Sequence, residues 1–224
     1  MSTWGVIFDW DGVIIDSEPH HQQSWELLAA ELDRPLPDGY FKKSFGMKSE
    51  RIIPEILRWS DDPAEIRAIT DRKAALYREI MSKEGVAPLP GAEAFLHRLK
   101  NDSIPCAVAS STPRLNIACV LDRIDLGGFF RDIVAAEDVT HGKPHPEIFL
   151  LAAQRLGLPA NRCVVFEDSQ VGIEAGLAAD MKVIGVATTH MADSLQRAHR
   201  VVRRLDELLV HDLVSMMASG AGVC

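Results

Sequence analysis

The chain has 224 residues with a formal net charge of -8, and 47% of its residues are hydrophobic. These values are typical of a soluble globular protein of one or two domains. The acidic balance argues against a nucleic-acid partner, because neutralisation of phosphates by Lys and Arg supplies most of that affinity. No apolar run approaches the roughly 20 residues that cross a bilayer, and residues 1–5 lack a signal-peptide pattern.

These features predict a protein of the cytoplasm without a membrane partner, or an organellar protein whose transit peptide has been removed. A monomer is expected, although the sequence leaves the oligomeric state open. The four cysteines include no CxxC pair, and Cys106 and Cys163 lie in apolar runs. Reduced thiols within a core are therefore expected rather than a disulfide framework.

Short apolar runs recur along the chain at residues 4–8, 104–109, 133–136, 163–166 and 183–186. Their brevity and β-branched residues predict strands buried on both faces of a parallel sheet, although buried helix fragments can show the same pattern. Helical patterns separate these runs at residues 91–100, 146–156 and 172–179, and a short last strand with a helix is expected over 201–209. The alternation predicts an α/β fold with a Rossmann-like, doubly wound parallel sheet, in which ligands bind beyond the carboxyl ends of the strands.

The segment between residues 18 and 85 interrupts this alternation because it contains no strand pattern. Residues 20–32 predict an amphipathic helix, and Asp62 with the following Pro-Ala-Glu predicts a helix that continues to about Met81. A third helix is expected over 49–59, where Pro54 would produce a kink or mark the true start. We therefore predict an α-helical cap domain at residues 18–85, inserted into a catalytic core formed by residues 1–17 and 86–224.

The densest group of polar residues follows the first predicted strand, where Asp9 and Asp11 precede Gly12. Carboxylates in this position can bind Mg²⁺, and one of them can attack phosphorus to form an aspartyl-phosphate. Taken alone the pair is weak evidence, because Asp-x-Asp-Gly is also typical of ordinary turns.

A second polar segment, Ser110-Ser111-Thr112, ends the second predicted strand. Its hydroxyls and backbone N–H groups can hold an anion, and capping of the next helix is an equally good interpretation. Further along, Lys143 lies in a Pro-containing loop, where a single lysine is more commonly solvated.

A fourth polar segment, Glu167-Asp168, ends the most apolar strand. The strand would hold both acids at the carboxyl edge of the sheet, which makes a purely solvated role harder to accept. Several acids at one edge also need a cation to offset their repulsion.

In this order, the four segments resemble the motifs of the haloacid dehalogenase superfamily of phosphohydrolases, in the subfamily with a helical cap after the first motif. The resemblance runs from about residue 4 to 187 and rests on residues 8–13, 108–112, 142–144 and 165–172. Residues 4–5 and 201–204 additionally resemble plant plastid phosphatases of riboflavin synthesis.

The resemblance implies a nucleophile and a metal site. Asp9 would attack phosphorus, and Asp11 would be the general acid/base, with its main-chain carbonyl on the metal. Asp168, supported by Glu167, would complete the Mg²⁺ site. The expected metal ligands are thus these four acids.

The resemblance also implies a phosphate site made by Ser110, Ser111 and Lys143, of which Ser110 and Lys143 would also be catalytic. The expected activity is that of a Mg²⁺-dependent phosphatase of a small phosphorylated metabolite, a sugar or polyol phosphate. These roles agree with phosphoryl transfer, which depends on positioning and on electrostatic stabilisation of the equatorial oxygens.

A β-phosphoglucomutase-like phosphosugar mutase is the alternative activity. Its branch of the superfamily resembles this chain in His21, four residues before a Trp, and in Lys73, four residues before a Tyr, although phosphatases share both features. The mutase branch also has a cap-loop Arg after a Gly. Direct counting places Ser49 there, and the cations that could replace the Arg are Lys48 and Arg51.

Thr112 and Arg114 are further candidates for contacts with the substrate. An alternative of another class is a non-catalytic phosphoacceptor or metabolite-binding module, since receiver domains also combine clustered acids, a Ser/Thr and a Lys on an α/β sheet. The acceptor on the first strand, the cap-sized insertion and an intact Asp11 favour turnover over that alternative.

Overall fold

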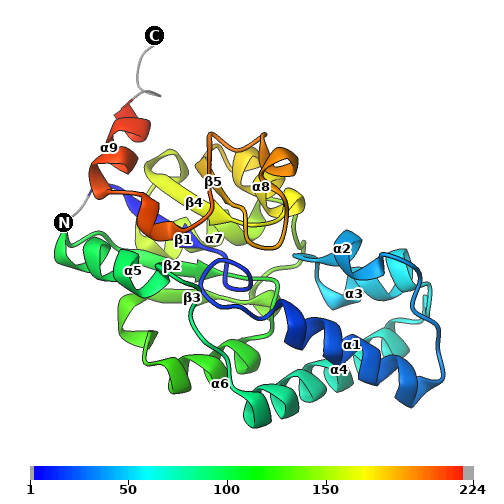
Figure 1. Ribbon diagram of the computed structural model, residues 1–224. Coiled ribbons are helices and arrows are strands. Elements are labelled where there is room, and N and C mark those ends of the chain that lie inside the picture. The colour runs from blue at the N-terminus through cyan, green and yellow to red at the C-terminus, as the bar shows by residue number, and fades with distance from the viewer. Residues whose placement is uncertain (1–2, 219–224) are drawn as a thin grey trace.

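The apolar runs form a six-stranded parallel sheet in the computed structural model, which describes residues 3–218 (Figure 1). The strand order is β3-β2-β1-β4-β5-β6. Since the chain runs outward from β1 on one side and from β4 on the other, the predicted doubly wound α/β fold is confirmed. The strands are β1 Gly5–Phe8, β2 Cys106–Ala109, β3 Asp132–Val134, β4 Cys163–Glu167, β5 Lys182–Val186 and β6 Arg200–Val202.

Helices cover both faces of the sheet, so its central strands β1, β2 and β4 are buried on two sides. Along β1, Val6 and Phe8 join one apolar cluster, whereas Ile7 joins the cluster on the opposite face. This explains why the strand sequences are nearly unbroken apolar runs. The first face is covered by α5 Ala92–Asn101, α6 Arg114–Ile124 and α9 Val210–Ala218, and the second by α7 Glu147–Leu156 and α8 Gln170–Ala178.

The predicted core helices are confirmed with small shifts at their ends. Ser169 caps α8 by accepting a hydrogen bond from the Gly172 N–H at 3.1 Å, so this helix begins before the Ala-rich stretch that predicted it. The segment expected to follow the last strand as one helix is a short 3₁₀ turn, Leu205–Glu207, before α9. The terminal residues 219–224, expected to be frayed, lie outside the described residues.

Between β1 and α5 the described chain is helical and contains no strand, as predicted. Figure 1 shows this cap as a separate group of helices beyond one edge of the sheet, with α1 and α4 side by side. It has an apolar cluster of its own, which includes Trp25, Leu28 and Ile53. The cap elements are α1 Glu18–Leu32, α2 Tyr40–Ser44, α3 Ser49–Arg51, a π-helical segment Ile52–Leu57, and α4 Pro63–Glu84.

The cap helices differ from prediction where local chemistry is unusual. Asp62 caps α4 as expected, with Oδ1 accepting from the N–H groups of Ala64 at 2.9 Å and Glu65 at 2.8 Å. Pro54, in contrast, neither starts nor ends a helix, because it lies within the π-helical segment. The wider turn accommodates a residue without an N–H.

The two linkers between cap and core run next to each other. Leu89 N–H donates to Ile14 O at 2.8 Å, and Asp16 N–H donates to Ala87 O at 3.3 Å. The linkers therefore meet beside the carboxyl end of β1 and bring the cap over that edge. The residue boundaries at 17/18 and 85/86 stay a prediction.

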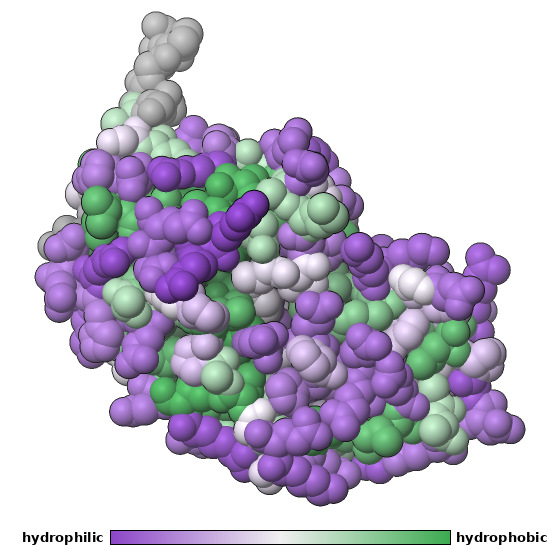
Figure 2. Space-filling model, viewed as in Figure 1, coloured by the Kyte–Doolittle hydropathy of each residue, from purple (hydrophilic) through white to green (hydrophobic). Residues whose placement is uncertain are grey.

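The face of the molecule seen in Figure 2 is mostly polar. Figure 2 shows hydrophilic side chains over most of the face in view and a notch between the upper part of the core and the cap.

Within residues 3–218, no helix combines the length and apolar character that a membrane crossing requires. Cys106 and Cys163 are buried free thiols, as expected.

Candidate active site

The turn after β1 places two carboxylates at the centre of the sheet edge. Asp9 N–H donates to Phe166 O at 2.9 Å, which continues the pairing of β1 with β4 by one residue. The chain then reverses at Gly12, whose φ of 74° is accessible mainly to glycine. A Cβ at this position would lie 2.0 Å from Asp168 Oδ2, so Gly12 is also needed for the close approach of the fourth segment.

Lys143 joins the first segment to the fourth. Its Nζ lies 2.7 Å from Asp9 Oδ1 and 2.5 Å from Glu167 Oε1, and its side chain has no solvent exposure. Burial alone would lower the pKa of Lys143, but the charges of Asp9 and Glu167 raise this pKa above its ordinary value. The buried lysine is therefore a fixed cation rather than the solvated side chain that its sequence context alone would favour.

Asp9, Glu167 and Asp168 have carboxylate oxygens within 4.8 Å of one another. Three acids face a single ammonium, so negative charge is in excess. Burial raises the pKa of Asp9 despite the opposing Lys143, and burial with the charge of Glu167 raises the pKa of Asp168 well above its usual range.

The buried carboxylate of Asp168 is only partly satisfied by hydrogen bonds. Its Oδ2 accepts a hydrogen bond from Thr189 Oγ1, whereas its buried Oδ1 has no hydrogen-bond partner. A buried, unsatisfied carboxylate oxygen is costly. Hard oxygen ligands and uncompensated negative charge fit a divalent cation at this position.

Asp11 points away from these acids and toward the cap linker. Its Oδ1 accepts from Ser17 Oγ at 2.6 Å and lies 3.0 Å from His21 Nε2, and its Oδ2 accepts from Thr112 Oγ1 at 2.5 Å. Burial opposes ionisation of Asp11, but His21 and the two hydroxyls hold its pKa below the ordinary range. The side chain is thus oriented from both domains.

Lys73 and His21 extend this network into the cap. Lys73 Nζ lies 2.7 Å from His21 Nδ1, and the imidazole stacks on Tyr77 with ring centroids 4.3 Å apart. Burial lowers the pKa of Lys73 to about 7. Burial and the charge of Lys73 also lower the pKa of His21. A continuous chain of polar groups therefore connects α4 with the carboxylate of Asp11.

The depressed pKa of Lys73 predicts a pH-dependent stability. Between its pKa of about 7 in the folded protein and about 10.4 in the unfolded chain, the unfolded state binds more protons, so stability rises with pH. The free energy of unfolding of the wild type should rise relative to Lys73→Met by about 1.4 kcal/mol per pH unit in this window. Urea denaturation at several pH values measures it. Lys83→Met, at an exposed position of the same helix, is the control: its difference in unfolding free energy from the wild type should not change with pH. If the difference between the wild type and Lys73→Met is also independent of pH, the depressed pKa of Lys73 is contradicted.

A cavity between cap and core brings most of the predicted residues together. Its volume is about 60 Å³. Ser110 Oγ accepts from the Thr112 N–H at 3.1 Å, and Ser111 Oγ donates to Gly46 O of the cap at 2.9 Å. The predicted residues that line the cavity are Asp9, Asp11, His21, Lys73, Ser110, Ser111 and Thr112.

Three predicted substrate contacts lie outside this cavity. Lys48 Nζ donates to Val139 O at 2.7 Å, and Arg51 Nη1 donates to Lys143 O at 3.0 Å, so both cap cations contact core loops. Arg114 forms an ion pair with Asp138 beside β3. The structure therefore does not bring these three side chains to Asp9.

Sequence reasoning missed two residues that hold the acids in place. Ser17 binds Asp11, and Thr189 binds Asp168. In the predicted domain division, Ser17 is only the last core residue before the cap. Thr189 follows shortly after the carboxyl end of β5. This position at the ligand-binding edge of the sheet is the one sequence feature from which its role could have been predicted.

The comparisons with known proteins agree with this geometry. The family model of haloacid dehalogenase-like hydrolases matches residues 5–180. The chain is 41% identical over 212 residues to the chloroplastic 5-amino-6-(5-phospho-D-ribitylamino)uracil phosphatase of Arabidopsis thaliana. That match covers 93% of this chain but 56% of the plant protein. The chain is also 31% identical over 182 residues to the fructose-1-phosphate phosphatase of Escherichia coli (strain K12), with 81% of this chain and 95% of that protein covered.

Among solved structures, the crystal structure of beta-phosphoglucomutase from Clostridium difficile matches with a TM-score of 0.86 and 25% identity. The match covers 98% of this chain and 99% of that one, so core and cap are shared together. The resemblance of the four motifs is thereby confirmed. Because the family model spans most of the chain, the protein is an enzyme of the haloacid dehalogenase-like hydrolase family.

Proposed function

We propose that this chain is a Mg²⁺-dependent phosphatase of a small sugar or polyol phosphate. The observation that carries the proposal is the position of Asp9, which follows the central strand, is held by Lys143 at 2.7 Å and lines the cavity. A carboxylate fixed in this way can attack phosphorus in line with the leaving oxygen.

In the first step, a carboxylate oxygen of Asp9 bonds to phosphorus while the bond from phosphorus to the ester oxygen breaks. Asp11 gives a proton to that leaving oxygen; for this it must first take up a proton, which the approach of an anionic phosphate favours. In the second step, Asp11 removes a proton from water, which attacks the aspartyl-phosphate and releases inorganic phosphate and Asp9. Atoms and protons balance over the two steps.

Other residues of the site bind or orient. Ser110, Ser111 and Lys143 would hold the phosphoryl oxygens. Glu167 would position Lys143, because its Oε1 is taken by Lys143 and its Oε2 by Ser169 at 2.8 and 2.9 Å.

The metal site would consist of Asp9, Asp168 and the main-chain carbonyl of Asp11. Mg²⁺ bound there would supply positive charge that offsets the developing charge on the phosphoryl oxygens. The unpaired Oδ1 of Asp168 supports this assignment. Oxygen ligands favour Mg²⁺ over softer ions.

The substrate class rests on the relatives and on the cavity wall. The plant relative is named for a phosphorylated ribityl compound and the bacterial relative for fructose 1-phosphate. Ser44, Ser49 and Asn116 line the cavity beside the acids. These side chains can hydrogen-bond to the hydroxyl groups of a sugar or polyol.

The test is phosphate release from a panel of sugar, polyol and nucleotide phosphates, with Mg²⁺ and with EDTA. We expect release from at least one sugar or polyol phosphate, its loss in EDTA and its return when Mg²⁺ is added in excess. Release that EDTA does not affect would contradict the metal assignment. No release from any phosphate ester would favour a non-catalytic phosphate-binding module.

A phosphosugar mutase is the second candidate function, favoured by the match to a solved beta-phosphoglucomutase over both domains. It predicts activation by a sugar bisphosphate and interconversion of sugar phosphates without phosphate release. Ser49 lines the cavity and Arg51 does not, so the cap loop offers no arginine there for a second phosphate. This arrangement favours the phosphatase.

The proposal also includes the location and the oligomeric state of the protein. We place it in the cytoplasm as a monomer, with an organelle as the alternative because the plant relative is named chloroplastic. Fluorescence microscopy of the tagged full-length protein and light scattering of the purified chain test the two statements.

A further inference from the structure

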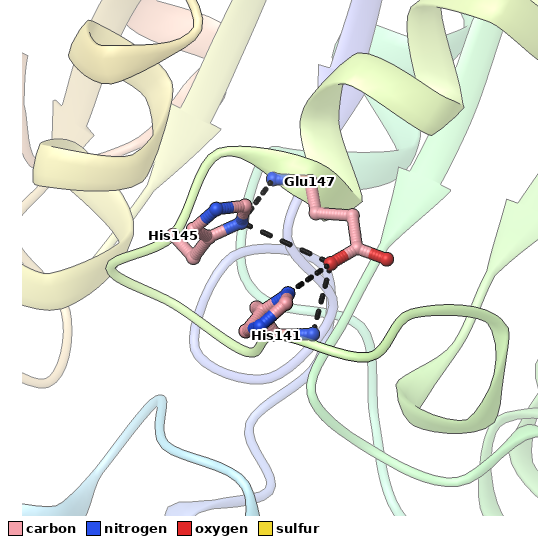
Figure 3. Close-up of side chains that lie close together, drawn as sticks. All are labelled: His141, His145 and Glu147. Atoms are coloured by element: carbon pink, nitrogen blue, oxygen red, sulfur yellow. Dashed lines mark hydrogen bonds and ion pairs between the residues drawn. The ribbon is translucent and has the colours of Figure 1, made fainter.

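The loop that carries Lys143 also places three potential metal ligands on the outer surface of the core. Figure 3 shows His141, His145 and the carboxylate of Glu147 directed toward one another where the loop enters α7. Their ligand atoms lie within 4.8 Å of one another. Both imidazoles are exposed, so their side chains can adjust by rotation.

Glu147 is held in a fixed orientation. Its Oε1 accepts from Thr140 N–H at 2.9 Å, and its Oε2 accepts from His141 N–H at 2.9 Å. These backbone hydrogen bonds hold the pKa of Glu147 down to about 2. The carboxylate is therefore ionised throughout the neutral range, and a second lone pair on Oε2 remains for another partner.

The two imidazole nitrogens face that lone pair. His141 Nδ1 lies 3.0 Å from Glu147 Oε2. His145 Nδ1 lies 3.9 Å from the same oxygen. Its lone pair accepts from Glu147 N–H at 3.3 Å, a long hydrogen bond that an ion bound at Nδ1 would replace. The backbone hydrogen bonds of the loop explain why a glutamate lies at position 147. They do not explain why two histidines lie beside its carboxylate.

We propose that His141, His145 and Glu147 bind a divalent transition-metal ion such as Zn²⁺, at a site separate from the acids around Asp9. Two imidazoles with one carboxylate are a donor set that Zn²⁺ and its neighbours use, whereas Mg²⁺ requires oxygen ligands. On binding, the proton on His141 Nδ1 is exchanged through solvent for one on Nε2, so that the imidazole stays neutral. The cation then lies between Nδ1 and Glu147 Oε2.

The surroundings leave room for the remaining ligands of such an ion. His141 and His145 border a groove of about 710 Å³ between the loop and the cap. Two cap cations also line this groove and would oppose a bound ion. Both cations already have partners outside the cluster, since Lys48 donates to Val139 O and Arg51 forms an ion pair with Glu55. Water from the groove can complete a tetrahedral coordination.

The experiment measures Zn²⁺ binding by titration calorimetry in excess Mg²⁺, for the wild type and for His141→Ala and His145→Ala. We expect the wild type to bind one ion more than either variant, or the variants to bind it at least about tenfold more weakly, because loss of even an outer-shell partner costs a metal site about 10–100-fold. Any Zn²⁺ taken up by the Asp9 acids persists in all variants and cancels in the comparison.

His97→Ala is the matched control, because His97 is exposed and lies 3.9 Å from Glu93 without a second imidazole in the cluster. It should bind Zn²⁺ as the wild type does, and thermal unfolding should show that all four proteins are folded. Equal stoichiometry and affinity in the wild type and both variants, or no binding by the wild type, would overturn the proposal. The readout is binding and not turnover, so it is independent of the proposed phosphatase activity.

Discussion

Asp9→Asn is expected to lower kcat by about 10⁴-fold or more, a rise of about 5.5 kcal/mol in the activation barrier. An amide cannot form the aspartyl-phosphate, so the reaction loses its nucleophile and not merely an orienting contact. Binding of the substrate should persist, because Ser110 and Lys143 are unchanged. Steady-state phosphate release with the best substrate of the panel, together with its KM, measures both effects.

The same substitution should leave the fold intact. Asn has nearly the size of Asp, and Lys143 keeps its ion pair with Glu167 at 2.5 Å. One negative charge is also removed from an acid-rich cluster, so the melting temperature should stay the same or rise. Asp16→Asn is the matched control, since Asp16 is an exposed carboxylate of the same loop. Near-wild-type turnover by Asp9→Asn would remove Asp9 from the mechanism, and so would an equal loss in the control.

The centre of the sheet could be predicted from the sequence because its burial is uniform. All four residues of β1 and all four of β2 are buried, so each strand appears as an unbroken apolar run between polar segments. Parallel strands also place their carboxyl ends at one edge, and this predicted that Asp9, Ser110 and Asp168 would converge. Neither inference required knowledge of a side-chain conformation.

The cap was less predictable because its elements are short or irregular. The helix α2 has only five residues, too few to display a helical period. The π-helical segment around Pro54 satisfies its backbone by a rare hydrogen-bond pattern, which residue composition does not specify. The long helix α4 was predictable because Asp62 and Pro63 mark its start chemically.

Side-chain directions at the site were the least predictable feature. Asp9 and Asp11 are two residues apart, yet one carboxylate faces Lys143 and the other faces Ser17, His21 and Thr112. The direction depends on the turn at Gly12 and on the contact that His21 of the cap makes with Asp11. Arg114, next to the second segment in sequence, likewise binds Asp138 instead of lining the cavity.

Lys143→Met is expected to destabilise the metal-free protein by about 3–5 kcal/mol, as does removal of one partner from a buried ion pair. The ammonium lies between Asp9 and Glu167; Lys143 and Glu167 are fully buried, and Asp9 is nearly so. Without it, two carboxylates are left in a low-dielectric interior with no cation and with Asp168 nearby. Urea denaturation measures the loss, and Lys83→Met at an exposed position of the cap should change the stability far less.

Mg²⁺ should restore part of the stability that Lys143→Met loses, because a divalent ion at Asp9 and Asp168 offsets the same excess of negative charge. Activity should not return with stability, since the variant lacks the cation that holds the phosphoryl oxygens; we expect about 10²–10³-fold lower kcat at saturating Mg²⁺. A variant as stable as the wild type without metal would show that Lys143 does not compensate these acids. Rescue of stability together with full activity would show that the metal alone provides the charge that phosphoryl transfer requires.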